Sequence, residues 1–407
     1  MTDQDGATAW HAPRPSWDLY RKMQDSPLVS PARRQATTWA LDQLERRMGP
    51  DWLERYYQAS GHVPTEINLG GAHVAALGNL LDIALRLAIL DQVKGVGKVQ
   101  KEMRTDLRDD RRRHCALQLE VGGLAAREGY AVTFEDPHDR GAPPSDVVLR
   151  RGGQTIRLET FAIIRDKQSQ DAARYWDRIS QAILRIEWKH DVPISGIITR
   201  QLGERETTDL LDALERAAQE TAATHQPREV SRPGAELTIE IPGTSRHRLD
   251  FGIEETRSWP RIESKLRQKA EQAQAAGGGW LRTDLLDGTW AFTPWARAGL
   301  RTKITEMSKL VRPLLNHYPA ISGLVLSNGA SLAQGQFVGE SAPAPSQNYG
   351  LRRVLPAVRV RETMIIPANA EGLRQARQWV GIYNAEDTWL DWALKLHGLP
   401  PWSTIRP

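Results

Sequence analysis

Two acidic residues, Asp146 and Glu159, are spaced so that a β-hairpin would bring them face to face. Apolar runs flank the pair Gly152-Gly153 that lies between them, and this pattern is typical of a two-residue turn. A tight turn at these glycines places Asp146 opposite Glu159, with Cβ atoms about 5 Å apart. Two carboxylates that close repel each other unless a metal ion, a shared proton or a cation lies between them. The hairpin therefore predicts a site that holds a cation or a proton.

The same hairpin also has a simpler interpretation. Strand alternation puts Arg150 and Arg157 on the face that carries the two acids. In that case the arginines would neutralise both carboxylates on a solvated sheet surface, and the hairpin would have no chemical role. The elements around the hairpin bear on this choice.

Hydrophobic periodicity predicts a sequence of elements around the hairpin that is typical of an α/β sandwich. In chain order these are a helix over 116–128, a strand over 130–134, the hairpin over 146–164, a helix over 170–188 and a buried strand over 194–199. A right-handed crossover would add the last strand to the sheet of the hairpin.

These residues resemble the PD-(D/E)xK nuclease superfamily, which includes restriction-endonuclease-like and recombination nucleases. The resemblance rests on Glu120 in the first helix, on Pro144-Ser145-Asp146 at the start of the hairpin and on Glu159 in its second strand, and it covers residues 113–200. It implies an α-βββ-α-β core, with Asp146 as the first metal-binding aspartate, Glu159 as the second acid and Glu120 as a further metal ligand. The expected cofactor is Mg²⁺ or Mn²⁺, which would activate water for phosphodiester hydrolysis.

One position departs from the family pattern. The family has a lysine two residues after the second acid, where this chain has Phe161. A phenyl ring neither orients water nor donates to a phosphate. Two lysines within 113–200, Lys167 and Lys189, could supply a relocated ammonium group, although each also fits an ordinary surface position. The sequence therefore predicts catalysis by Asp146 and Glu159 with Lys167 or Lys189, or a nuclease fold without activity.

Arginine dominates the basic residues. Lysine and arginine together number 54, and 11 of these are lysines, which leaves 43 arginines. Arginine suits two-pronged contacts with phosphate and base edges, although a codon bias would give the same excess. The run Arg111–Arg113 is the predicted nucleic-acid contact, with DNA as the predicted partner. A balanced, solvated helix surface explains that run equally well.

Composition excludes several other classes of protein. The chain of 407 residues has a single cysteine, Cys115, so it has no intrachain disulfide and suits a reducing, cytoplasmic setting. Its most apolar stretch, 72–93, contains Asn, Asp and Arg and predicts a buried helix instead of a membrane span. No phosphate-binding loop, zinc-ligand spacing or serine-hydrolase motif is present.

Breaks in composition predict four parts: a helical N-terminal region (1–110), the nuclease-like core (111–223), a second α/β block (235–332) and a small C-terminal extension of strand and helices (350–407). The second block contains its own polar group. Asp250 and Glu254 share a strand face, and Lys265 and Lys269 share a helix face beyond them. A surface strand followed by an amphipathic helix accounts for this group as well as a second site does.

Three functions remain open from the sequence. The first is a metal-dependent nuclease, the second a degenerate nuclease-fold protein that binds nucleic acid or a protein partner, and the third a structural α/β protein without a nucleic-acid role. The preference between DNA and RNA and the oligomeric state are also left open.

Overall fold

The computed structural model describes residues 15–406 with internal gaps at 28, 61–62, 65–73, 138–140, 142, 164–174, 176–178, 180–181, 184, 188, 242–247, 252–257, 286–299, 329–330, 333–339, 344–347 and 356–358. The chain forms two compact units. Unit 1 contains Met1–Ile164 and Ile262–Pro407, and unit 2 contains Arg165–Arg261. Unit 2 is thus an insertion within the sequence of unit 1.

Unit 1 is built on one mixed sheet with the strand order β1-β2-β3-β8-β9-β13-β12-β11, and β10 also pairs with β13. Its strands are β1 (Ala131–Pro137), β2 (Pro144–Arg151), β3 (Gln154–Ile163), β8 (Gly279–Leu285), β9 (Ile321–Asn328), β10 (Ser331–Leu332), β11 (Glu340–Pro343), β12 (Tyr349–Leu355) and β13 (Arg359–Pro367). β3, β8 and β9 run parallel, and the other pairs are antiparallel. The α/β class expected from the sequence is confirmed.

The predicted hairpin is confirmed in β2 and β3. Gly152 and Gly153 have φ angles of 55° and 77°, which a primed two-residue turn requires and which glycine adopts without steric cost. The register runs from Arg151↔Gln154 to Val147↔Leu158, as expected for a turn at these glycines. The ladder ends one pair before Asp146 and Glu159.

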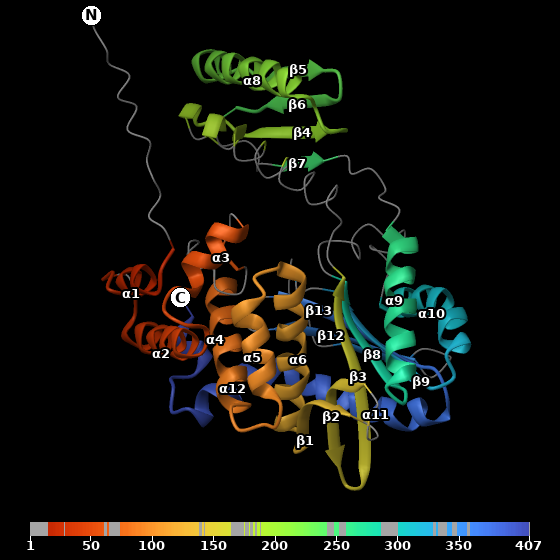
Figure 1. Cartoon of the computed structure of the whole chain (residues 1–407). Helices are drawn as coiled ribbons and strands as arrows, with labels where there is room; N and C mark the ends of the chain where they lie inside the picture. Colours follow the sequence, from red (N-terminus) through yellow and green to blue (C-terminus); the bar gives the residue numbers. More distant parts are fainter. Residues whose placement is uncertain are drawn as a thin grey trace, which may run out of the picture. The chain divides into compact units, whose positions relative to one another are not determined.

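Helices cover both faces of the sheet near the hairpin (Figure 1). α6 (Asp109–Arg127) lies on one face, and α9 (Ser258–Ala275) and α10 (Leu300–His317) lie on the other. α9 presents the buried stripe Ile262, Leu266 and Ala270, spaced four residues apart, to the sheet. Taken with the insertion removed, the order α6, β1, β2, β3, α9, β8 is an α-βββ-α-β arrangement.

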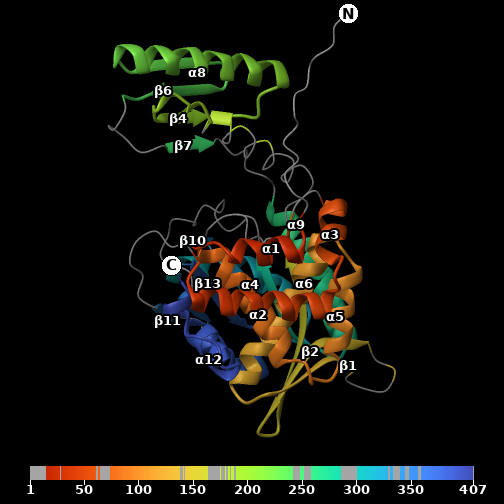
Figure 2. The ribbon, with the colours of Figure 1, turned by 90° about the vertical axis from the view of Figure 1, so that its left-hand side faces the viewer.

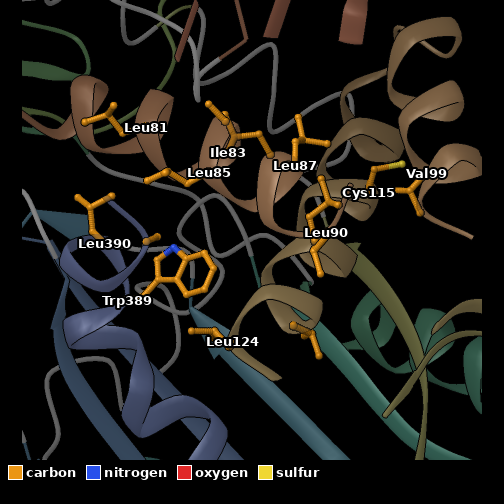
Figure 3. Packing of buried hydrophobic residues seen from close by; sticks show 14 of the residues in the cluster. Leu81, Ile83, Leu85, Leu87, Leu90, Val99, Cys115, Leu124, Trp389 and Leu390 are labelled. Carbon is orange, nitrogen blue, oxygen red and sulfur yellow. The ribbon is translucent and has the colours of Figure 1, made fainter. Parts of the chain in front are cut away.

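The remaining helices of unit 1 pack beside α6 and enclose a large apolar core. They are α1 (Trp17–Gln24), α2 (Pro31–Met48), α3 (Trp52–Ser60), α4 (Val74–Ile89), α5 (Val96–Thr105), α11 (Ala370–Asn384), the 3₁₀ helix η1 (Ala385–Thr388), α12 (Trp389–Leu396) and α13 (Trp402–Ile405). Figure 2 views α1 and α2 from the side, with α4 and α12 beside them. Leucines of α4 pack close to Trp389 and Leu390 of α12 (Figure 3). The two ends of unit 1 therefore share one core.

Unit 2 has a smaller sheet with the order β5-β6-β4-β7. Its elements are β4 (Ile194–Ile198), α8 (Glu204–Thr224), β5 (Arg228–Arg232), β6 (Ala235–Ile239) and β7 (Arg248–Phe251). Apolar residues of α8, such as Leu210 and Leu214, share a core with Ile194 and Leu237 of the strands. Unit 2 thus has a hydrophobic core of its own.

The structure corrects the expected division of the chain. The strand expected over 194–199 is β4, but it pairs with β6 and β7 and not with the hairpin. The expected core 111–223 and second block 235–332 are both divided between the two units. The interval between these two expected parts, 224–234, contains β5, which pairs with β6 in the sheet of unit 2. The helix and strand that complete the main sheet come after the insertion, and they are α9 and β8.

Within the described part of the chain, no helix is both long enough and apolar enough to span a membrane.

Candidate functional site

Asp146 lies where β2 separates from β3. Ser145 still pairs with β1, whereas the pairing of β2 with β3 ends at Val147. At this point the Asp146 carboxylate, and not a backbone carbonyl of β2, accepts the hydrogen bond from β3. Its Oδ2 atom accepts hydrogen bonds from the backbone N–H of Thr160 at 2.7 Å and from the Thr160 hydroxyl at 3.0 Å. A side chain thus replaces the backbone acceptor at the end of the ladder, and these hydrogen bonds fix the position of its carboxylate.

Glu159 lies beside Asp146 and is more deeply buried, with a side chain 9 % exposed. Its nearest cation among the described residues is Lys269 of α9, whose Nζ atom lies 4.0 Å from Oε2 of Glu159. Lys269 follows Leu266 by three residues, so it lies beside the stripe of α9 that packs on the sheet. The hairpin and α9 therefore bring two acids and one lysine together within unit 1.

The two carboxyl groups have opposite electrostatic environments. Burial and then the charge of Asp146 raise the pKa of Glu159 to about 8, although Lys269 and a hydrogen bond from the Asp146 backbone act to lower it. Burial also acts to raise the pKa of Asp146, but the hydrogen bond and charge of His114, followed by the charge of Lys269, outweigh burial and lower it. One lysine is too little positive charge for two buried acids. The pair is thus a site that gains from a further proton or cation.

A third element, α6, reaches Asp146 from the other face of the sheet. His114 Nε2 lies 3.2 Å from Oδ2 of Asp146, and the side-chain amide of Gln118 lies 3.1 Å from the same ring nitrogen. His114 and Gln118 are one helical turn apart and share a helix face. Both are buried.

Glu120 does not join this group, which corrects the expected ligand set. Its carboxylate accepts hydrogen bonds from Arg282 of β8 at 3.0 Å and from Arg361 of β13 at 2.6 Å. Glu120 follows Gln118 by two residues, so it points about 200° away around the helix. Within the described residues, no group of three or more His, Cys, Asp and Glu side chains is arranged to hold a metal ion.

Glu120 belongs to a closed cluster of buried charges, the arginine cluster, defined as Glu120, Arg282, Asp284, Arg361 and Glu386. Burial acts to raise the pKa of Glu120, but the charges of Arg361 and Arg282 outweigh it and lower the pKa to about 2. For Glu386 burial prevails, and the pKa rises to about 7.

The predicted nucleic-acid contact at Arg111–Arg113 is also corrected. Arg112 is buried, donates to the Tyr56 hydroxyl at 3.3 Å and lies over the Tyr56 ring. Arg111 is half exposed and lies 3.7 Å from Glu102. Because successive helix positions turn by 100°, a run of three arginines cannot form one outward-facing contact.

The two lysines proposed from the sequence are not brought to the acid pair. Lys167 lies outside the described residues. Lys189 belongs to unit 2, where it forms an ion pair with Glu215. Phe161, at the position where the resemblance implies a lysine, is buried.

The arginines that might have neutralised the acids lie elsewhere. Arg150 forms an ion pair with Asp136. Arg157 donates to the backbone oxygen of Asp136 at 3.4 Å. The second polar group expected from the sequence is divided as well, because Asp250 belongs to unit 2 and Lys269 to unit 1, while Glu254 lies outside the described residues.

Two carboxylates fit a Mg²⁺ site of the open kind, in which one or two acidic side chains bind the ion and water and phosphate oxygens complete its coordination. The surplus negative charge at Asp146 and Glu159 is the observation behind this fit. Glu120 drops out of the predicted ligands because its carboxylate is already held by two arginines.

Sequence reasoning missed the role of Lys269, although the needed signal is in the chain. The helix over 258–275 and the strand over 279–285 repeat the helix–strand order expected directly after the hairpin. If an insertion of about a hundred residues had been assumed between the hairpin and this helix, the sequence would have predicted Lys269 as the lysine beside the acid pair.

Comparisons with protein-family models, with curated proteins and with solved structures found no match to this chain. The functional assignment therefore depends on the geometry of the site.

Proposed function

We propose that this protein is a metal-dependent phosphodiesterase that cleaves nucleic acid, with DNA as the preferred substrate and Mg²⁺ or Mn²⁺ as the cofactor. The observation that carries the proposal is the buried pair of Asp146 and Glu159 with Lys269 beside it. The α-βββ-α-β order, with α9 and β8 after the insertion, supports the resemblance to the PD-(D/E)xK superfamily.

Each side chain has a role in this proposal. Asp146 and Glu159 bind the metal ion, which when bound supplies an activated water and offsets negative charge on the phosphate. Lys269 takes the role of the family's lysine, because Phe161 occupies the position of that lysine in this chain. Its ammonium group, close to the Glu159 carboxylate, orients water or donates to a phosphate oxygen. A relocated lysine explains how Phe161 is compatible with catalysis.

A cleavage assay on single- and double-stranded DNA and RNA, with Mg²⁺, Mn²⁺ or EDTA, tests the proposal. We expect metal-dependent cleavage that Asp146→Asn and Glu159→Gln each abolish. Lys269→Met should lower the rate by roughly 100-fold or more, as loss of a general acid–base group does. Lys265→Met, on the same helix, is the matched control and should cleave normally. Cleavage that survives Asp146→Asn would place the chemistry elsewhere.

The double variant Phe161→Lys/Lys269→Met asks whether the two lysine positions are equivalent. It moves the ammonium group from α9 to the strand position of the family pattern. Partial recovery relative to Lys269→Met would support a shared role. Circular dichroism must accompany this assay, because Phe161 is buried and a lysine there costs stability.

A protein that binds nucleic acid without cleaving it is the second function to test, and the buried Phe161 is the observation that favours it. Fluorescence anisotropy at several salt concentrations separates these cases. Phosphate contacts predict an affinity that falls steeply as salt rises. Binding of that kind without metal-dependent cleavage would favour the non-catalytic function. A cytoplasmic location is part of the proposal and is supported by the single, buried Cys115.

A further inference from the structure

The two oxygens of the Asp146 carboxylate have unequal surroundings. Oδ2 accepts from the backbone and hydroxyl groups of Thr160 and faces Nε2 of His114. Among the described residues, Oδ1 has no hydrogen-bond donor. One oxygen is thus anchored from two elements, and the other is left for a ligand.

The proton on His114 is assigned by its neighbours. An ionised carboxylate offers only acceptor atoms, and Oδ2 of Asp146 lies 3.2 Å from Nε2 of His114. Nε2 of His114 therefore carries a proton and donates to Oδ2. The atom of Gln118 that lies 3.1 Å from the same nitrogen is its amide Nε2. An N–H group cannot donate to a protonated Nε2, so donation from His114 to Asp146 requires the Gln118 amide to be turned by 180°, with its oxygen toward the ring.

We infer that His114, backed by Gln118, is a positioning residue that fixes Asp146 by Oδ2 and leaves Oδ1 as the ligand atom for a divalent cation. This inference rests on the proposed metal-dependent function. His114 is not itself a ligand, because the ring nitrogen that faces the acids is already bonded to Asp146. Outer hydrogen-bond partners of this kind orient a ligating carboxylate before the metal arrives.

Mn²⁺ binding to the full-length protein, without nucleic acid, tests the inference. Calorimetry should show Mn²⁺ binding that Asp146→Asn abolishes and that His114→Leu weakens roughly 10- to 100-fold, the usual cost of losing an outer-shell partner. His114→Gln keeps an N–H donor near the position of Nε2 and should recover much of the affinity. His317→Leu, on the exposed end of α10, is the matched control and should bind Mn²⁺ normally.

Electron spin-echo spectroscopy of the Mn²⁺ complex separates a positioning role of His114 from direct coordination of the metal by its ring. We expect no coupling to a directly coordinated imidazole nitrogen. Such a coupling would make His114 a ligand and overturn the positioning role. Unaltered Mn²⁺ affinity in His114→Leu would overturn it as well.

The failure of this inference differs from the failure of the proposed function. If the wild type binds Mn²⁺ and loses it in Asp146→Asn but not in His114→Leu, only the positioning role is wrong. If the wild type binds no Mn²⁺, both are wrong. Thermal unfolding in EDTA identifies any variant that has lost its fold. Gln118→Met then gives an independent measurement at the same hydrogen bond, and it should weaken Mn²⁺ binding less than His114→Leu.

Discussion

Unit 1 contains two groups of buried charges. The arginine cluster places Arg282 and Arg361 among three carboxyl groups, each of which lies within 3.0 Å of a guanidinium nitrogen. The acid pair of Asp146 and Glu159 has a lysine at 4.0 Å and a histidine at 3.2 Å. Carboxyl groups outnumber arginines or lysines by one in both groups, but the ion pairs are close in the arginine cluster and loose in the acid pair. The close ion pairs hold the elements of the arginine cluster together, whereas the acid pair is the site that we propose for a cation.

The largest expected effect concerns the arginine cluster. Arg282→Met removes a fully buried guanidinium, which takes away the arginine partner of Asp284 and one of the two arginine partners of Glu120. The free energy of unfolding should fall by about 3–5 kcal/mol, as it does when one partner of a buried ion pair is removed. Urea unfolding measures this loss, and Arg377→Met on the exposed side of α11 is the control. A loss below about 1 kcal/mol would make the cluster incidental to stability.

A second comparison lies within the cluster. Glu120→Gln removes a carboxylate held charged between two arginines and should cost about 2 kcal/mol. Glu386 has a pKa raised to about 7 by burial, so a neutral amide replaces it at lower cost, below about 1 kcal/mol at pH 7. Urea unfolding of both variants at pH 7 is the measurement. Equal losses would show that the two carboxyls have the same charge state.

Replacing an acid of the pair Asp146 and Glu159 should stabilise the protein at high pH, whereas the replacements in the arginine cluster destabilise it. The pKa of Glu159 is raised to about 8, so between its ordinary value near 4.5 and pH 8 the folded state binds more protons than the unfolded state. Stability then falls as pH rises through this window. Glu159→Gln removes this loss and should gain on the order of 4 kcal/mol at pH 8.5 relative to pH 5. Urea unfolding in EDTA at pH 5 and pH 8.5 tests this prediction. A difference in stability between the variant and the wild type that is the same at both pH values would contradict it.

Lys269→Met should have the smallest effect on folding. The ammonium group is 4.0 Å from Glu159, a loose pairing, and the pKa of Glu159, raised to about 8, keeps its carboxyl largely protonated at pH 7. We expect a loss below about 1 kcal/mol at pH 7, compared with Lys265→Met by thermal unfolding. A loss as large as that of Arg282→Met would show that Lys269 holds the fold together, which would weaken its assignment to catalysis.

Local signals in the sequence predicted the hairpin correctly. Gly152-Gly153 and the flanking apolar alternation determine both the turn and the register, so the proximity of Asp146 and Glu159 followed from a few neighbouring residues. Signals of this kind need no knowledge of the rest of the fold.

Long-range arrangement accounts for the errors. Lys269 is far from the hairpin in sequence and reaches it only because β8 pairs with β3 beyond the insertion. Glu120 was assigned to metal because its partners, Arg282 and Arg361, come from strands whose position in the sheet is not encoded locally. His114 was missed because a lone helical histidine carries no spacing signal.

The insertion of unit 2 also determines when the site can form during synthesis. Asp146 and Glu159 leave the ribosome well before Lys269, which lies 110 residues after Glu159. At typical translation rates this interval is roughly 5–20 s. During it, the hairpin lacks both the lysine of α9 and its parallel neighbour β8. A nascent or prematurely ended chain would therefore carry the acids without the ammonium group, so the proposed hydrolytic activity would be confined to chains whose synthesis has passed the insertion.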